Sequence, residues 1–400
     1  MSYGSDNPWP PRDLLDAHLG FGTRCIHAGQ PAEPVTGAVM VPIYQTSTYV
    51  QDGVGGHRGY EYARTGNPTR TALETCLASL EGGKHGICFA SGCAATTTAI
   101  HLLQPGDHVV SSDDVYGGTW RIFQTVFQPL GIEFSFVDMT DLEATRAALR
   151  PGKTKMLWVE TPTNPLLKIV DIEACAALAH EVDAWCFVDN TFATPCFQNP
   201  LALGADAVLH STTKYLGGHS DVVGGAILSN DDEIAGNLFR LQNSIGATPG
   251  PQDCFLTMRG VKTLHLRMAA HERGARAVAE FLSGHEEVDR VIYPGLSSHP
   301  QYEVARRQMS GFGGMVSFEL RGDLARAERF VSSTRVMTLA ESLGGVESLI
   351  ELPAAMTHAS VPKATREAIG IADGLIRVSV GVEEPDDLCA DLKQAFERSR

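Results

Sequence analysis

The sequence has little of what marks membrane, disulfide-rich and nucleic-acid-binding proteins. No apolar run approaches the roughly 20 residues that a membrane-spanning helix needs. The nine cysteines are scattered and form no Cys-x-x-Cys pair, which favours a reducing compartment over a disulfide framework. Positive charge is in deficit, because 32 basic residues face 47 acidic ones and leave a net charge of -15. Nucleic acid and anionic membranes are therefore poor partners, and we expect a cytoplasmic protein.

Common site motifs are also missing. Gly83-Lys84 has Ala78 where a Walker loop needs its first glycine, and no GxGxxG opens a helix. An NTPase or a Rossmann dehydrogenase is therefore unsupported. The His-Glu pairs at 271–272 and 285–286 lack a second histidine one helical turn on, so we predict no metal site.

The length of 400 residues suggests two domains, with an added arm. Residues 1–62 are rich in Gly, Pro and Thr, and we expect an arm that packs on another subunit, with the first ~20 residues as a loosely ordered tail. Residues 63–262 alternate apolar runs with helical stretches. Residues 263–400 open with a predicted helix, Thr263–Leu282, and read as a smaller α+β domain.

The alternation in residues 63–262 predicts a mostly parallel, seven-stranded sheet covered on both faces. The predicted strands are Gly86–Ala90, His108–Ser111, Phe134–Val137, Lys155–Glu160, Trp185–Asp189, Ala207–His210 and Gly225–Leu228. The predicted helices are Thr69–Leu80, Ala94–Leu103, Thr119–Gln128, Leu142–Leu149, Ile172–His180 and Asp232–Leu241. Sites in such sheets form beyond the carboxyl ends of the strands.

Lys214 follows one of these strand ends. Ser211 and Thr213 stand beside it, and Asp189 ends a neighbouring predicted strand. A lysine amine, a carboxylate and hydroxyls for a phosphate are what a pyridoxal phosphate (PLP) site needs, because the lysine forms the imine and the carboxylate keeps the ring nitrogen protonated. The structural alternatives are a surface lysine at a turn and a helix-capping aspartate.

Other residues suit the same site. The amides of Gly92 and Cys93, at a strand-to-helix turn, can bind a phosphate. Tyr116 can stack on an aromatic cofactor, and Arg64 suits bidentate phosphate binding. Arg377 lies in an apolar run, where a substrate carboxylate or a structural salt bridge would serve as its partner.

Taken together, these motifs resemble the Cys/Met-metabolism PLP enzymes of the transsulfuration pathway, from about Thr23 to the C-terminus. The motifs that carry the resemblance are Tyr62–Thr69, Ser211–Ser220, Leu339–Leu349 and Met356–Ser360. The resemblance implies the PLP-dependent transferase fold type I, which is aspartate aminotransferase-like. It also implies a homotetramer built of two catalytic dimers.

By resemblance, Lys214 is the Schiff-base lysine, Asp189 the partner of the ring nitrogen, and Tyr116 a stacking and proton-transfer residue. The phosphate would be held by Ser211, Thr213 and the amides of Gly92 and Cys93. Many members have Met at position 93, but only the amide is needed there.

The resemblance also assigns residues to a neighbouring subunit and to the substrate. Tyr62 and Arg64 would reach the phosphate of an adjacent subunit's cofactor. Asn164, Ser342 and Arg377 would bind the substrate carboxylate.

Two carboxylates narrow the choice of reaction within the family. Glutamate at both Glu61 and Glu341 resembles cystathionine γ-lyases, where these side chains would receive the distal ammonium of cystathionine. Methionine γ-lyases tend to have cysteine where this chain has Gly118, and an apolar residue at 341. Bacterial cystathionine γ-synthases often have Asp at 61.

We therefore expect γ-elimination of L-cystathionine to L-cysteine, 2-oxobutyrate and ammonia, with production of hydrogen sulfide as a side activity. The alternatives are a cystathionine γ-synthase, a β-lyase, an O-acetylhomoserine sulfhydrylase or methionine γ-lyase, and a catalytically silent PLP-binding assembly protein. The presence of Lys214, Tyr116, Asp189 and Arg377 argues against the last.

Overall fold

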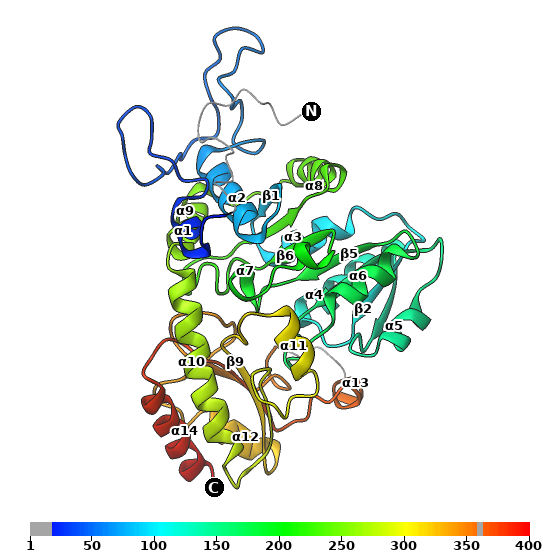
Figure 1. Cartoon of the computed structure of the whole chain (residues 1–400), viewed down its shortest axis with the longest axis vertical. Helices are drawn as coiled ribbons and strands as arrows, with labels where there is room; N and C mark the ends of the chain where they lie inside the picture. Colours follow the sequence, from blue (N-terminus) through cyan, green and yellow to red (C-terminus); the bar gives the residue numbers. More distant parts are fainter. Residues whose placement is uncertain (1–17, 358–362) are drawn as a thin grey trace.

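The computed structural model describes residues 18–357 and 363–400 (Figure 1). Its larger sheet has seven strands in the order β1-β7-β6-β5-β4-β2-β3. Only β7 runs antiparallel to its neighbours, β1 and β6, so the prediction of a mostly parallel seven-stranded sheet is confirmed. The strands are β1 (His85–Phe89), β2 (His108–Ser112), β3 (Glu133–Val137), β4 (Thr154–Glu160), β5 (Trp185–Asp189), β6 (Ala207–His210) and β7 (Gly225–Ser229).

Both faces of this sheet are buried, because successive strand residues point to opposite sides. On β4, Trp158 joins a core cluster with α3 (Gly92–Ile100) and α8 (Asp232–Ile245), whereas Leu157 and Val159 join a second cluster with α6 (Ile172–His180). The helices and short turns of this half are α2 (Pro68–Glu81), α3 (Gly92–Ile100), α4 (Gly117–Arg121), α5 (Leu142–Ala148), α6 (Ile172–His180), α7 (Thr194–Phe197), η3 (Pro200–Leu203), α8 (Asp232–Ile245) and α9 (Pro251–Val261).

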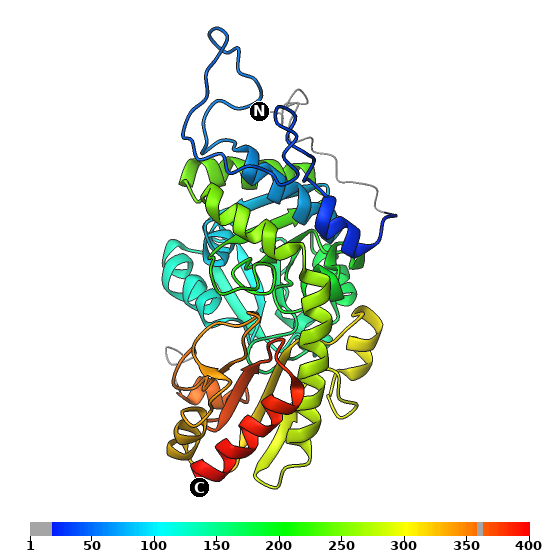
Figure 2. The ribbon, with the colours of Figure 1, turned by 90° about the vertical axis from the view of Figure 1, so that its left-hand side faces the viewer.

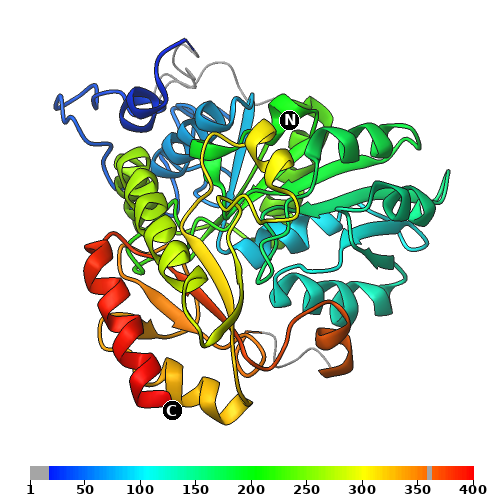
Figure 3. The same ribbon diagram turned by 60° about the horizontal axis from the view of Figure 1, so that its bottom comes forward.

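A second sheet of five strands, in the order β10-β11-β12-β9-β8, forms the smaller half. Its strands are β8 (Val288–Ile292), β9 (Met315–Leu320), β10 (Thr338–Leu339), β11 (Leu349–Glu351) and β12 (Leu375–Ser379). Its helices are α10 (Leu264–Ser283), α11 (Tyr302–Gln308), α12 (Leu324–Val331), α13 (Lys363–Ala368) and α14 (Pro385–Ser399). The long α10 runs from the larger half down beside this sheet (Figure 2), and Figure 3 shows the two halves side by side. The boundaries predicted for the domains stay predictions.

Some segments differ from the sequence prediction. The helix expected over Thr119–Gln128 is divided into α4, a π-helical turn (Ile122–Phe127) and a 3-10 turn (Gln128–Leu130). A helix not predicted, α1 (Phe21–His27), packs on α2 and α10. No helix among the described residues is both long and apolar enough to cross a membrane.

The predicted arm forms loops that extend away from the body of the molecule (Figure 1). Several of its apolar side chains are uncovered: Val35 is 88% exposed, Val39 87% and Val50 73%. The segment Val41–Tyr49 is not part of either sheet, and its one bridge pairs Thr48 with Tyr62. Most of the predicted tail (residues 1–17) and positions 358–360 of the Met356–Ser360 motif lie outside the described residues.

Candidate active site

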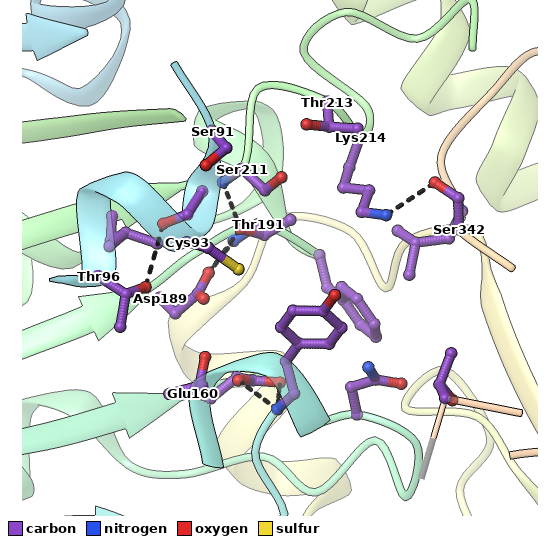
Figure 4. Close-up of a pocket in the computed structure, with 18 of the residues that line it drawn as sticks. Ser91, Cys93, Thr96, Glu160, Asp189, Thr191, Ser211, Thr213, Lys214 and Ser342 are labelled. Atoms are coloured by element: carbon purple, nitrogen blue, oxygen red, sulfur yellow. Dashed lines mark hydrogen bonds between the residues drawn. The ribbon is translucent and has the colours of Figure 1, made fainter. Parts of the chain in front are cut away.

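A cavity of about 260 Å³ lies where the carboxyl ends of the large-sheet strands meet the smaller half. Strand ends supply most of the lining, because parallel strands end at one edge of a sheet. Of the predicted site residues, the lining includes Gly92, Cys93, Tyr116, Asn164, Asp189, Ser211, Thr213, Lys214, Glu341, Ser342 and Arg377. Segments more than 280 residues apart in the sequence thus share one cavity (Figure 4).

Lys214 lines this cavity from the loop after β6. Its Nζ donates a hydrogen bond to Ser342 Oγ at 2.7 Å, across the boundary between the two halves (Figure 4). Burial, with a smaller effect of the nearby Arg377 charge, lowers the Lys214 pKa from 10.5 to about 8. A lysine in this environment supplies a neutral amine near physiological pH, as imine formation and proton abstraction both require.

The loop that carries Ser342 is held tightly against Lys214. Ser342 has a φ of 90°, an unusual backbone conformation for a residue other than glycine. Gly344 has a φ of 79°, and a Cβ there would lie 2.6 Å from the Tyr215 nitrogen. Glycine is therefore required for the loop to approach the lysine this closely.

Asp189, at the end of β5, is held by its neighbour Thr191. The Thr191 amide and hydroxyl donate to Asp189 Oδ1 at 3.0 and 2.6 Å. The Thr191 hydroxyl also accepts from the Ser211 amide at 2.9 Å, so the same residue ties β5 to the lysine loop. Burial raises the Asp189 pKa, while the two Thr191 hydrogen bonds oppose that rise.

A second carboxylate, Glu160, ends β4 directly beside Asp189 in the sheet register. Burial and the neighbouring Asp189 raise the Glu160 pKa well above its usual value. Since two adjacent carboxylates do not readily ionise together, we assign the proton to Glu160, which leaves Asp189 as the anion. That anion faces the cavity, where it can pair with a protonated ring nitrogen.

Tyr116 reaches the cavity from the loop before α4. Its amide donates to both oxygens of Glu160, at 3.2 and 2.9 Å, which fixes the backbone that carries the ring. The side chain is 39% exposed and lines the cavity. Burial raises its pKa, so the phenol keeps its proton at neutral pH and can act as a proton donor.

The start of α3 and the lysine loop form the polar end of the cavity. Ser91 caps α3 by accepting from the Ala94 amide at 3.0 Å. The first amides of the helix, those of Gly92 and Cys93, have no acceptor within the helix and are suited to an anion. The Thr213 hydroxyl exchanges hydrogen bonds with the backbone of Gly224, at 3.0 and 3.2 Å.

Arg377, on β12, enters the cavity from the smaller half. Its guanidinium donates to Asn164 Oδ1 and to the Ser342 carbonyl, each at 2.8 Å. It also pairs with Glu351 at 3.0 Å, so the salt bridge considered from the sequence exists alongside the cavity. Arg377 thus contacts both of the other predicted carboxylate-binding residues.

Three predicted residues do not line the cavity of their own chain. Glu61 and Tyr62 are exposed at the end of the arm, and Arg64 is exposed just after it. The Arg64 guanidinium lies 5.5 Å from the Tyr62 ring and donates to the Asn243 carbonyl. These positions leave them available to another chain.

The residues that line the cavity are chemically suited to the groups of PLP. The low-pKa amine of Lys214 suits an aldehyde, the paired Asp189 suits a ring nitrogen, and the α3 amides suit a phosphate. The sequence reading missed Glu160, Thr191 and Glu351. Glu160 ends a predicted strand as Asp189 does, and that signal could have found it.

The comparisons with known proteins agree with this geometry. The model of the family described as Cys/Met metabolism PLP-dependent enzyme matches residues 22–397. A cystathionine gamma-lyase of Dictyostelium discoideum is 54% identical over 379 residues, covering 94% of this chain and 98% of that protein. A cystathionine beta-lyase of Lactococcus lactis is 55% identical, with coverages of 94% and 98%. A cystathionine gamma-synthase of Mycobacterium bovis is 57% identical, with coverages of 94% and 97%.

The fold is also close to that of a relative of known structure. The crystal structure of cystathionine gamma-lyase from Lactobacillus plantarum complexed with L-serine has a TM-score of 0.93 and 48% sequence identity. The likeness covers 95% of this chain and 99% of that one. The chain therefore belongs to the Cys/Met metabolism PLP-dependent enzymes, with their fold and with pyridoxal phosphate as its cofactor.

Proposed function

We propose that the protein catalyses γ-elimination of L-cystathionine, in which cystathionine and water give L-cysteine, 2-oxobutyrate and ammonia. The observation that carries this proposal is Glu341, a carboxylate that lines the cavity on the same loop as Ser342. Cystathionine has an ammonium group at its far end, and a carboxylate there complements it. The Dictyostelium relative named cystathionine gamma-lyase also supports this choice.

Arg377, Asn164 and Ser342 would bind and orient the substrate α-carboxylate. The guanidinium offers parallel N–H groups to a carboxylate, and Asn164 holds it in place through the bond to Nη1. This orientation would place the Cα proton near Lys214, whose Nζ already lies 2.7 Å from Ser342 Oγ.

Lys214, as the neutral amine, would take the proton from Cα, would give it up to the carbon of the bound cofactor that is joined to the substrate nitrogen, and, neutral again, would take the Cβ proton. When bound, the cofactor supplies an electron sink for the electron pair left at Cα, with Asp189 as partner of its ring nitrogen. Tyr116, which keeps its proton because of its raised pKa, would give that proton to the sulfur as the C–S bond breaks. Lys214 is the alternative donor.

A second chain would complete the site. Glu61, Tyr62 and Arg64 lie outside the cavity of their own chain, at the end of and just after an arm that has exposed apolar side chains. We propose a tetramer of two catalytic dimers, in which Tyr62 and Arg64 reach the neighbour's cofactor phosphate and Glu61 the distal end of its substrate. We also propose the cytoplasm as its location and hydrogen sulfide production as a side activity.

A cystathionine γ-synthase is the second candidate, because the Mycobacterium bovis relative has that name and the residues described would serve γ-replacement as well. A cystathionine β-lyase is the third candidate, because the Lactococcus lactis relative has that name.

Product analysis after incubation of the purified PLP-loaded protein with L-cystathionine tests the proposal. We expect cysteine and 2-oxobutyrate in equal amounts, and no product from Lys214→Ala. Homocysteine with pyruvate would show that the substrate binds in the reverse orientation and would refute γ-elimination. Absence of turnover with the cofactor's visible absorbance intact would favour the synthase.

A further inference from the structure

The proposed carboxylate subsite contains a carboxylate of the protein itself. Glu351, on β11, stands directly opposite Arg377 of β12 in the sheet register. Its Oε1 lies 3.0 Å from Arg377 Nη1, and the two side chains are only 1% and 2% exposed. Thr357 donates to the same oxygen at 2.8 Å. Within the described part of the chain, Glu351 Oε2 is buried and accepts no hydrogen bond.

The hydrogen bonds of the guanidinium leave room for a second anion. Of its five N–H groups, Nη1 serves Asn164 and Glu351, and Nη2 serves the Ser342 carbonyl. Arg377 Nε is buried without a partner among the described residues. An Nε–H and one Nη2–H therefore remain, and a carboxylate can accept from two such parallel groups. Glu351 and a substrate carboxylate would then share one arginine through different N–H groups.

Sharing has an electrostatic consequence. A buried arginine without a counter-charge is unfavourable, so Glu351 stabilises Arg377 in the enzyme without substrate. Burial raises the Glu351 pKa, and the Arg377 charge opposes that rise. A substrate carboxylate that reaches Arg377 therefore meets a pair close to neutral instead of a full positive charge.

We propose that Glu351 is a resident counter-anion that positions Arg377 and limits the affinity of the site for the α-carboxylate of an amino acid. This inference rests on the proposed role of Arg377 in carboxylate binding. Weak ground-state binding fits a catalyst, because affinity common to substrate and transition state does not raise turnover.

The test compares two ligands that differ only in the carboxylate, L-alanine and ethylamine, neither of which has a leaving group. Their dissociation constants are measured from the visible absorbance of the PLP-loaded protein. Glu351→Gln keeps an oxygen that accepts from Arg377 and Thr357 but removes the charge. We expect it to bind alanine about tenfold more tightly and ethylamine as before.

A matched control is Glu303→Gln, which removes the same charge from an exposed side chain of α11, outside the cavity. Solvent screens that position, so we expect less than about a threefold change in alanine affinity. If Glu351→Gln does not fold, Glu351→Asp is used, because its shorter carboxylate lies farther from Nη1. It should tighten alanine binding by a smaller factor.

The outcomes separate the two proposals. The role of Glu351 alone would be overturned if Glu351→Gln and Glu351→Asp bind alanine no more tightly than the wild type, while Arg377→Gln loses the preference for alanine over ethylamine. A preference for alanine that survives in Arg377→Gln would overturn the role of Arg377, and with it the inference. Tighter alanine binding by Glu351→Gln with ethylamine unaffected supports both.

Discussion

The lowered pKa of Lys214 predicts how the protein without cofactor captures PLP. With a pKa of about 8, one Lys214 amine in about ten is neutral at pH 7. For a lysine at the ordinary 10.5, the fraction is about one in three thousand. Because only the neutral amine attacks the aldehyde, Lys214 should react with PLP at pH 7 about 300-fold faster than its unshifted pKa would allow.

The assay follows the growth of visible absorbance when PLP is mixed with the cofactor-free protein at pH 6 to 10. A model amine measured in parallel corrects for the ionisation of PLP itself. The corrected rate constant should rise tenfold per pH unit below pH 7 and level off above a midpoint near pH 8. A rate constant still rising tenfold between pH 8.5 and 9.5 would refute the assigned pKa.

Variants around the lysine should move this midpoint in opposite directions. Arg377 lowers the Lys214 pKa, whereas Glu351 and Glu341 raise it. Arg377→Gln is therefore expected to shift the midpoint upward, and Glu351→Gln to shift it downward. Shifts of the same sign in both variants would show that the charges do not act as the distances imply.

Three further predictions follow from the same geometry. Because the Lys214 pKa is lower in the folded chain than in the unfolded one, the unfolded chain binds more protons between pH 8 and 10.5. The stability of the cofactor-free protein, relative to Lys214→Met, should therefore rise across that window in thermal melts, and a fall would contradict the shift. Asp189→Asn should weaken PLP retention roughly tenfold to a hundredfold in dialysis assays, since a charge-assisted hydrogen bond is lost, and unaltered retention would remove its proposed role. When the inactive variants Arg64→Ala and Lys214→Ala are mixed in equal amounts and co-assemble at random, half of the dimers contain one chain of each kind and one intact site of two. Activity should therefore recover to about a quarter of the wild-type value, and no recovery would place Arg64 in the site of its own chain.

The strand pattern was predictable because most large-sheet strands are short apolar runs that are buried on both faces, although the edge strand β3 is only partly buried. All seven predicted strands exist, and the strand-end rule located Asp189 and Lys214. The turn after β1 was equally readable, since Ser91 has the residue type and spacing of a helix cap.

Other features were beyond the sequence for physical reasons. Glu351 looks like one charge in a short apolar strand, and only the β11–β12 register reveals Arg377 opposite it. The interrupted helix after Tyr116 has an uninterrupted helical pattern in sequence, and nothing in that pattern marks the π turn. Among the described residues of the arm, those after α1 form loops joined only by isolated bridges, so their conformation depends on contacts that the sequence of one chain does not display.

The central claim is that this site eliminates at Cγ and does not build cystathionine. The most direct measurement is kcat/KM for cleavage of L-cystathionine to cysteine and 2-oxobutyrate, beside kcat/KM for cystathionine formation from an O-acylhomoserine and cysteine. We predict that cleavage is faster by at least about tenfold and that Glu341→Gln reduces it. Formation that exceeds cleavage, with Glu341→Gln leaving both unchanged, would contradict the account.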